Sequence, residues 1–235
     1  WVPDQDAQEW SYRADLLRSA AMEGTSSFGS YVIGQTTGMR PWGAAQKIFA
    51  LVGHGGKGID MYTWGPDVIS ADAWGAITNT YAPVARAMGR LGRSERVLFP
   101  GRPSRGSVAV LLPAASRIWG ANSDTPLYLD EARFQHYALI HAGYSVDFLD
   151  EQAIASNDFA ARGYQAIYVN GPNLPPAAVA NLAAWVNSGG VLAITPGAAV
   201  ADQYDEPNGD MDLLAGLGAR VAVRVGSPQP LHPVG

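Results

Sequence analysis

Residues 107–112 read SVAVLL, an almost wholly apolar run that decides the fold of the second half of the chain. Such a run is typical of a strand in a parallel sheet that helices cover on both faces. Apolar residues at helical spacing follow at 127–142, and further strand patterns lie at 144–150, 164–169 and 191–195. Alternating strand and helix patterns predict parallel βα units.

Proline and glycine mark the ends of the predicted helices in this half. Pro175-Pro176 opens the helical run AAVANLAAWVNS, because proline suits the first turn of a helix. Gly143 and Gly189-Gly190 follow helical runs, as C-terminal glycines commonly do. A short helix within 211–218 and a strand near 219–225 complete five parallel strands. This arrangement predicts a doubly wound, flavodoxin-like domain.

The first half of the chain shows the same alternation. The elements are predicted as a helix at 8–23, a short buried strand at 29–34, a helix at 42–52, a strand at 59–64 and a helix within 72–91. Pro83 predicts either a kink in the last helix or a late start. Residues 92–106 then lose periodicity and collect Gly, Pro, Ser and Arg. We therefore expect a first unit over 1–95, a linker over 96–106 and a second domain over 107–235.

The composition is that of a globular protein, and it excludes several functions. The 235 residues are 47% hydrophobic and 16% charged, with a formal net charge of −5 and no run of Lys or Arg. We therefore expect neither nucleic acid nor membrane as a partner. The absence of cysteine excludes disulfides, thiolate metal sites and cysteine nucleophiles. A start at Trp1 without a visible signal peptide predicts a piece of a longer chain, and it leaves both cytoplasmic and secreted locations open.

The segment GQTTGMRPW, residues 34–42, resembles the seventh-strand motif of the family 42 β-galactosidases, clan A glycoside hydrolases with the approximate pattern Glu-Gln-x-x-Gly-x-x-x-Trp. Gln35, Gly38 and Trp42 fall in register with it. The run HGGKGIDMYTW looks like the family's eighth strand and ends at Trp64. The second domain resembles the family's trimerisation domain, which has a class I glutamine-amidotransferase-like fold.

The resemblance implies the C-terminal part of a (β/α)8 barrel, with strands seven and eight, followed by the doubly wound domain. It also implies a carbohydrate ligand and a homo-oligomer, a trimer in the family. Two strands cannot close a barrel, which needs about eight. We therefore expect the remainder of the barrel in a longer polypeptide, or a partner that covers the open strand edges.

Gly34 occupies the position of the family's nucleophilic glutamate. Retaining glycosidases need two carboxylates about 5 Å apart, and glycine cannot form the glycosyl-enzyme bond. The acid/base would follow the fourth barrel strand, which this chain does not contain. Three explanations stay open: an engineered replacement, a natural branch that lost hydrolysis or moved the carboxylate, and a wrong register. We favour the natural branch and expect the chain alone to be inactive.

Asp60 and Asp67 are the nearest alternative carboxylates. Asp60 alternates with Tyr62 and Trp64, so the three are expected on one strand face. Asp67 falls in the loop after that strand, on the side where barrel active sites lie. A solvated or capping role is the stronger interpretation for each aspartate.

Four residues are the predicted sugar contacts: Gln35, Trp42, Tyr62 and Trp64. An exposed indole stacks well on a sugar ring, but cores use the same side chain. Core packing is favoured for Trp42, whereas the two roles of Trp64 are evenly matched because it ends a barrel strand.

No metal or cofactor is predicted. His54 precedes the second strand and is interpreted as structural. His136 and His141 stand at i, i+5 on one helix, off the spacing that a metal site needs.

Two activities of the second domain are excluded by its turns. The turn at 170–173 has no cysteine for amidotransferase chemistry. The turn at 113–116 has no Gly-x-Gly-x-x-Gly for a dinucleotide. A weaker hypothesis is a small-ligand crevice at the switch point of the sheet, lined by Asn170, Gly171 and Asn173.

The sequence therefore supports two functions. The first is a fragment of a β-galactosidase-like hydrolase that acts on β-linked galactose or a related sugar. The second is a non-catalytic carbohydrate-binding or assembly protein derived from such an enzyme.

Overall fold

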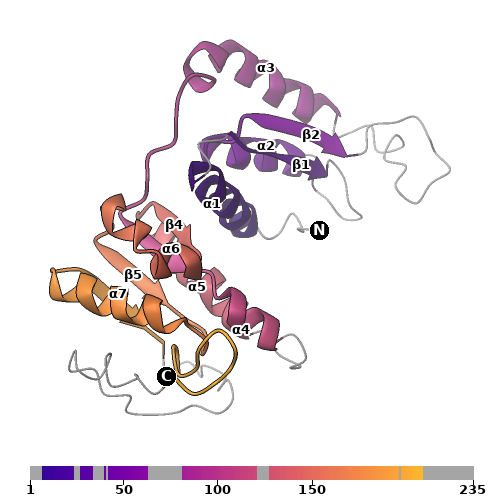
Figure 1. The fold of residues 1–235 in the computed structure, drawn as a ribbon. Coiled ribbons are helices and arrows are strands. Elements are labelled where there is room, and N and C mark those ends of the chain that lie inside the picture. Colours follow the sequence, from indigo (N-terminus) through magenta and orange to yellow (C-terminus); the bar gives the residue numbers. More distant parts are fainter. Residues whose placement is uncertain are drawn as a thin grey trace, which may run out of the picture. The chain divides into compact units, whose positions relative to one another are not determined.

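A computed structural model of the chain describes residues 7–23, 27–33, 40, 42–62, 81–120, 127–195 and 197–208. The chain divides into two compact units, Trp1–Ser104 and Arg105–Gly235 (Figure 1). Each unit has its own sheet and its own cluster of buried apolar side chains.

The first unit alternates helices and strands. Its elements are α1 (Ala7–Glu23), β1 (Gly29–Ile33), α2 (Gly43–Gly53), β2 (Gly58–Tyr62) and α3 (Tyr81–Leu98). The two strands are parallel and pair from Gly29 with Gly58 to Ile33 with Tyr62. A Cβ atom on Gly29 would lie 2.7 Å from the carbonyl oxygen of Gly58, so this close approach of the strands requires glycine.

One face of this small sheet packs against helices. The alternating residues Val32, Ile59 and Met61 belong to the apolar cluster of the unit. The helices contribute the remaining members of the cluster: Trp10 and Ala14 from α1, Ala44, Ile48 and Leu51 from α2, and Val84 and Ala87 from α3. Tyr31, on the opposite face, is 67% exposed. The expectation of a wholly buried strand at 29–34 is therefore wrong, because nothing in the described part of this unit covers the second face.

Helix α3 is described from Tyr81, and the residues that would separate a kink at Pro83 from a late start lie partly outside the described ranges. It continues to Leu98, so the prediction that regular structure ends at residue 91 is wrong. The reason is a tertiary cap: the Nζ atom of Lys57 donates hydrogen bonds to the carbonyl oxygens of Leu98 and Gly101. These satisfy carbonyls at the end of the helix that lack partners within it.

The second unit contains a four-stranded parallel sheet in the order β4-β3-β5-β6. The strands are β3 (Val108–Leu111), β4 (Val146–Leu149), β5 (Ala166–Val169) and β6 (Val191–Ile194). All four lie where the sequence predicted strands. Their order corresponds to the first four positions of the flavodoxin-like order 2-1-3-4-5. The helix predicted at 211–218 and the strand near 219–225 lie outside the described residues.

Helices cover both faces of this sheet. On one face, α5 (Leu127–His141) places His136 against Phe148 of β4, with the rings stacked at 5.5 Å between centroids. On the other face, Leu111 and Ile167 belong to a cluster with Leu182 of α7 (Pro176–Asn187). Gly143 and Gly189 adopt positive φ after α5 and α7, as the predicted helix ends required.

Three short helices were not predicted: α4 (Ala114–Trp119), α6 (Glu151–Ala155) and the 3₁₀ helix η4 (Asp158–Arg162). Each is too short for hydrophobic periodicity to emerge. Helix α6 nevertheless has a cap signal, because the Oδ1 atom of Asp150 accepts a hydrogen bond from the amide of Ala153 at 2.6 Å.

Candidate functional site

The candidate site is the face of β1 and β2 that turns away from the helices. Tyr31 and Asp60 are register partners on this face, and both side chains are exposed. Two residues earlier on each strand, Gly29 and Gly58 are also register partners. Because glycine has no side chain, this part of the face consists of backbone atoms. The sheet therefore presents a phenol and a carboxylate side by side, next to the carboxyl ends of two parallel strands.

Tyr31 was not among the residues predicted from the sequence. The sequence signal that could have identified Tyr31 is its alternation with Val32, which is fully buried against the helices. The predicted residue Asp60 is exposed, whereas the predicted sharing of a face with Tyr62 and Trp64 involves side chains outside the described part. Exposure at this position fits a solvated aspartate as well as a sugar contact.

The other predicted positions lie at or beyond the strand ends. Tyr62 is the last residue of β2 and pairs with Ile33, and its side chain is outside the described part. Gly34, Gln35, Trp64 and Asp67 also lie outside the described residues.

Trp42 follows β1 and precedes the first residue of α2. Its side chain is 48% exposed, and the guanidinium of Arg40 lies 5.5 Å from the ring centroid. The prediction that Trp42 packs in the core is wrong, because Ala44, Ile48 and Leu51 supply the core contacts of α2. A half-exposed indole has a face available for stacking on another ring.

His54 has the structural role predicted for it. Its Nδ1 atom lies 2.6 Å from Oδ1 of Asp15, which also accepts a hydrogen bond of 2.9 Å from Nε of Arg18. The second guanidinium donor of Arg18 reaches the carbonyl oxygen of Ser104 at 3.1 Å. This buried cluster connects α1 to the end of α2, before β2 begins.

The asparagines predicted at the switch point of the second unit make hydrogen bonds within the chain. Asn170 is fully buried and donates hydrogen bonds to the carbonyl of Leu111 and to Oε1 of Gln135. The backbone amide of Asn173 donates to Oγ of Ser116 at 2.9 Å, and its side chain donates to Asp205. These bonds hold the turn together, while the buried Oδ1 atom of Asn170 has no hydrogen-bond partner among the described residues.

A carboxylate occupies the start of helix α4 in the same region. Oε1 of Glu151 accepts a hydrogen bond of 2.9 Å from the amide of Ala115. Burial raises the pKa of Glu151, and the hydrogen bonds from the backbone oppose this shift. The amide that an anionic ligand could use is therefore bound to the chain's own side chain.

Within the described ranges, no group of three or more His, Cys, Asp or Glu residues could hold a metal ion. Among the helices that the structure describes, none is long and apolar enough to cross a membrane.

No protein-family model matches the sequence, and no curated protein matches it. Solved structures do. Gan42B, a GH42 β-galactosidase from G. stearothermophilus, matches with a TM-score of 0.70 and 17% identity, over 88% of this chain and 32% of that one. A β-galactosidase from Bacillus circulans sp. alkalophilus gives a TM-score of 0.61 at 16% identity, over 84% of this chain and 32% of that one. An apo GH42 exo-carrageenase from Bacteroides ovatus gives a TM-score of 0.56 at 15% identity, over 74% of this chain and 24% of that one.

These matches establish a shared fold. The chain is a mixed α/β protein with parallel sheets, similar to GH42 enzymes, and it spans about a third of the length of the two β-galactosidases. Gan42B and the exo-carrageenase are GH42 enzymes, the family that the strand motifs resemble.

Proposed function

We propose that this chain is the C-terminal part of the barrel, with the adjoining α/β domain, of a GH42-like glycoside hydrolase. The observation that carries the proposal is the exposed face of β1 and β2, which bears Tyr31 and Asp60 without any helix cover. Barrel strands have helices outside and packed side chains inside, so this face corresponds to the inside of a barrel. The fold shared with GH42 β-galactosidases supports the same assignment.

In this proposal, the ends of β1 and β2 form part of the wall of a sugar site. Trp42 and Trp64 stack on sugar rings, while Gln35 and Tyr62 contact hydroxyl groups. Gly34 stands at the nucleophile position, so this chain supplies no glycosyl-enzyme carboxylate there. The second unit acts as an oligomerisation domain.

Aryl β-galactosides provide the test, with the complete polypeptide that contains this chain as the enzyme. If another carboxylate has taken over as the nucleophile, we expect the wild type to hydrolyse the substrate. If hydrolysis was lost together with the glutamate, we expect hydrolysis only in the Gly34→Glu variant. Gly34→Gln is the matched control, because it adds similar bulk without a carboxylate. A folded protein that hydrolyses neither anomer, as the wild type or as Gly34→Glu, contradicts an enzymatic ancestry with this register.

The second candidate function is carbohydrate binding or assembly without catalysis, and the glycine at position 34 favours it. Titration calorimetry with β-linked galacto-oligosaccharides separates the two. Binding without turnover, weakened by Trp42→Ala, supports the binding function. Trp119→Ala is the control, because Trp119 is similarly exposed but lies on α4 of the second unit. Absence of binding leaves only the assembly function.

A further inference from the structure

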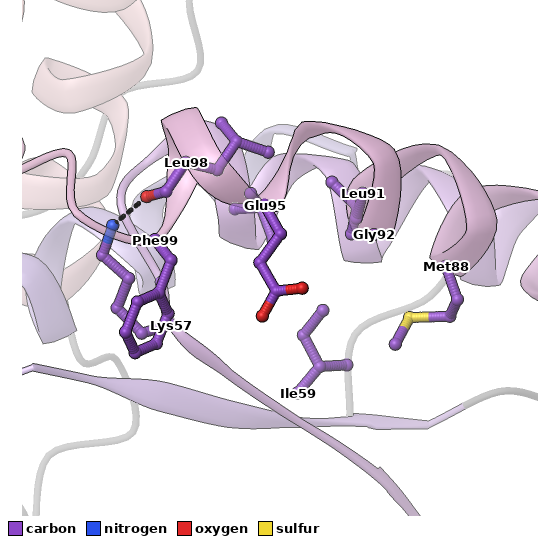
Figure 2. Close-up of a pocket in the computed structure, with 10 residues that line it drawn as sticks. Lys57, Ile59, Met88, Leu91, Gly92, Glu95, Leu98 and Phe99 are labelled. Carbon is purple, nitrogen blue, oxygen red and sulfur yellow. Dashed lines mark hydrogen bonds between the residues drawn. The ribbon is translucent and has the colours of Figure 1, made fainter.

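Two pockets of the first unit share Lys57 and Phe99 in their linings. The one drawn in Figure 2 lies between β2 and the C-terminal half of α3. The other is a cavity of about 630 Å³, formed by the end of α1, the turn before β2 and the segment 99–103 that follows α3. Phe28 and Lys57, which directly precede β1 and β2, both line this cavity. It therefore lies at the N-terminal ends of the strands, away from the candidate sugar site, and its volume suits a small molecule.

The segment 99–103 is fixed at both of its ends. The Nζ atom of Lys57 donates hydrogen bonds to the carbonyl oxygens of Leu98, as Figure 2 shows, and of Gly101. Gly55 lies against Pro103, since a Cβ atom on this glycine would be 2.9 Å from Cγ of the proline. The turn before β2 therefore holds the segment in place, and the walls of the cavity are built by the fold without a ligand.

The lining of this cavity is basic, although the chain has a formal net charge of −5. Arg18, Lys57 and Arg102 contribute to it, whereas no Asp or Glu of the described residues does. The charge of Arg18 is offset within the chain, because its Nε atom donates to Oδ1 of Asp15 at 2.9 Å. Its Nη1 atom donates to the carbonyl oxygen of Ser104 at 3.1 Å. The other two cations have no carboxylate partner among the described residues.

Lys57 and Arg102 retain hydrogen-bond donors for a ligand. An ammonium has three N–H groups, and the two hydrogen bonds of Lys57 go to neutral carbonyl oxygens. Arg102 is exposed, and its guanidinium makes no hydrogen bond or ion pair with the described residues. A guanidinium presents paired N–H groups that match two oxygen atoms of a phosphate, sulfate or carboxylate. The two side chains therefore supply the donors that an anionic group needs.

The large uncharged side chains of the lining are apolar: Met22, Phe28, Phe99 and Pro100. Phe28 is half-buried, and Phe99 is 68% exposed. An inorganic anion would use the donors and leave these side chains in contact with water. An apolar group attached to the anion would remove them from water, which is favourable.

We propose that this cavity binds an organic anion. Its phosphate, sulfate or carboxylate group contacts Lys57 and Arg102, and its aromatic or alkyl body lies against Phe28 and Phe99. The site is separate from the candidate sugar site, which lies at the carboxyl ends of the strands. The inference therefore stands or falls independently of the proposed glycosidase function.

A titration of the complete polypeptide with para-fluorophenyl phosphate, followed by fluorine NMR, tests the proposal. Inorganic phosphate and para-fluorophenol each carry one half of this probe, and both are measured by competition. We expect the probe to bind about ten-fold more tightly than either half, because only the whole probe combines the charged contact with apolar burial. Absence of binding contradicts the proposal, and it is the result expected if another part of the polypeptide fills the cavity. Equal affinity for inorganic phosphate contradicts the apolar half of the site.

Two pairs of variants locate the bound probe. Arg102→Glu should weaken its binding by about ten-fold or more, since an attractive charge becomes a repulsive one. Arg105→Glu is the matched control, because Arg105 is exposed and does not line the cavity. Equal weakening by both variants would show attraction to the general surface charge and would overturn the proposal.

The second pair tests the cavity without changing a charge. Ala21→Phe places a large ring in the lining and should abolish binding, whereas Ala20→Phe should leave it unchanged, because Ala20 is exposed on the same helix outside the cavity. Circular dichroism of both variants checks that the helix is intact. Undiminished binding in a folded Ala21→Phe variant would place the probe elsewhere and contradict the proposal.

Discussion

The two parallel sheets of this chain differ in what covers them. In the second unit, helices lie on both faces, and the central residues Val110 and Ile167 are fully buried. Among the described helices of the first unit, cover is found on one face of the sheet only, and Tyr31 and Asp60 are exposed on the other. Alternating strands and helices therefore give one sheet that is covered on both faces and one whose second face is open in the described part of the unit. We therefore predict that the second unit is the more stable of the two when each is isolated.

The largest expected effect comes from separating the units. Residues 105–235 alone should unfold cooperatively in urea, with a free energy of unfolding of about 5 kcal/mol or more. Residues 1–104 alone should show no cooperative transition, because a two-stranded sheet with one bare face buries too little apolar surface. Circular dichroism of both pieces and of the whole chain measures this. A sharp transition in residues 1–104 would show that the bare face needs no cover.

A matched pair of core substitutions sharpens the comparison. Ile167→Ala in the centre of the second sheet should lower the free energy of unfolding of its unit by about 4 kcal/mol, because a fully buried side chain leaves a cavity. Ile59→Ala in β2 should lower the free energy of local opening of the first sheet, measured by amide exchange, by only about 1 kcal/mol, because Ile59 is partly buried and lines an open apolar pocket. Equal losses for the two variants, when amide exchange is measured in both sheets, would mean that the two cores are equally complete.

Tight packing at the switch point of the second unit is tested at Gly171. Its φ is +83°, and an added Cβ would lie 2.7 Å from Cβ of Pro113 and from Oγ of Ser116. Gly171→Ala should therefore lower the free energy of unfolding by about 3 kcal/mol, combining backbone strain with a clash. Gly189→Ala is the control: its φ is +107°, but nothing lies within 4 Å of the added atom, so about 1 kcal/mol is expected. Similar values for both variants would indicate space at the switch point.

The smallest expected effect is a change in pH dependence at Glu151. Burial raises its pKa above the ordinary value of 4.5, so the folded state binds this proton more tightly than the unfolded state. The resulting stabilisation is complete below pH 4.5 and is lost as the pH rises through the pKa of the folded state. Glu151→Gln keeps an acceptor for the amide of Ala115 and has no charge. The free energy of unfolding of the wild type relative to Glu151→Gln should therefore fall as the pH rises through this range. A rise would mean that the backbone hydrogen bonds outweigh burial.

The sequence predicted the regular elements well and their surroundings less well. Periodicity placed α1, α2, α5, α7 and the strands from β1 to β6 within a few residues of their observed ends. It missed α4, α6 and η4, which have too few turns for a pattern. Periodicity also predicted that the strand corresponding to β1 is buried, although the run from Gly29 to Ile33 does not reveal whether anything covers Tyr31.

The candidate site was predicted only in part, for the same physical reason. The sequence named Asp60 as a candidate without predicting the open face on which it lies, and the packing preference for Trp42 failed because an indole suits a core and a surface equally. Tyr31 was overlooked because an apolar strand was interpreted as buried on both sides. The C-terminal cap of α3 by Lys57 depends on a tertiary contact across 41 residues, which no local pattern reveals.

Hydrogen–deuterium exchange of the 235-residue chain tests the central contrast most directly. We predict slow exchange for the amides of β3 and β5, which have a paired strand on each side and helices on both faces. We predict exchange faster by orders of magnitude for β1 and β2, because local opening of a half-covered sheet requires little free energy. Equal protection of the two sheets would contradict the account, since it would mean that the first unit already has a complete core.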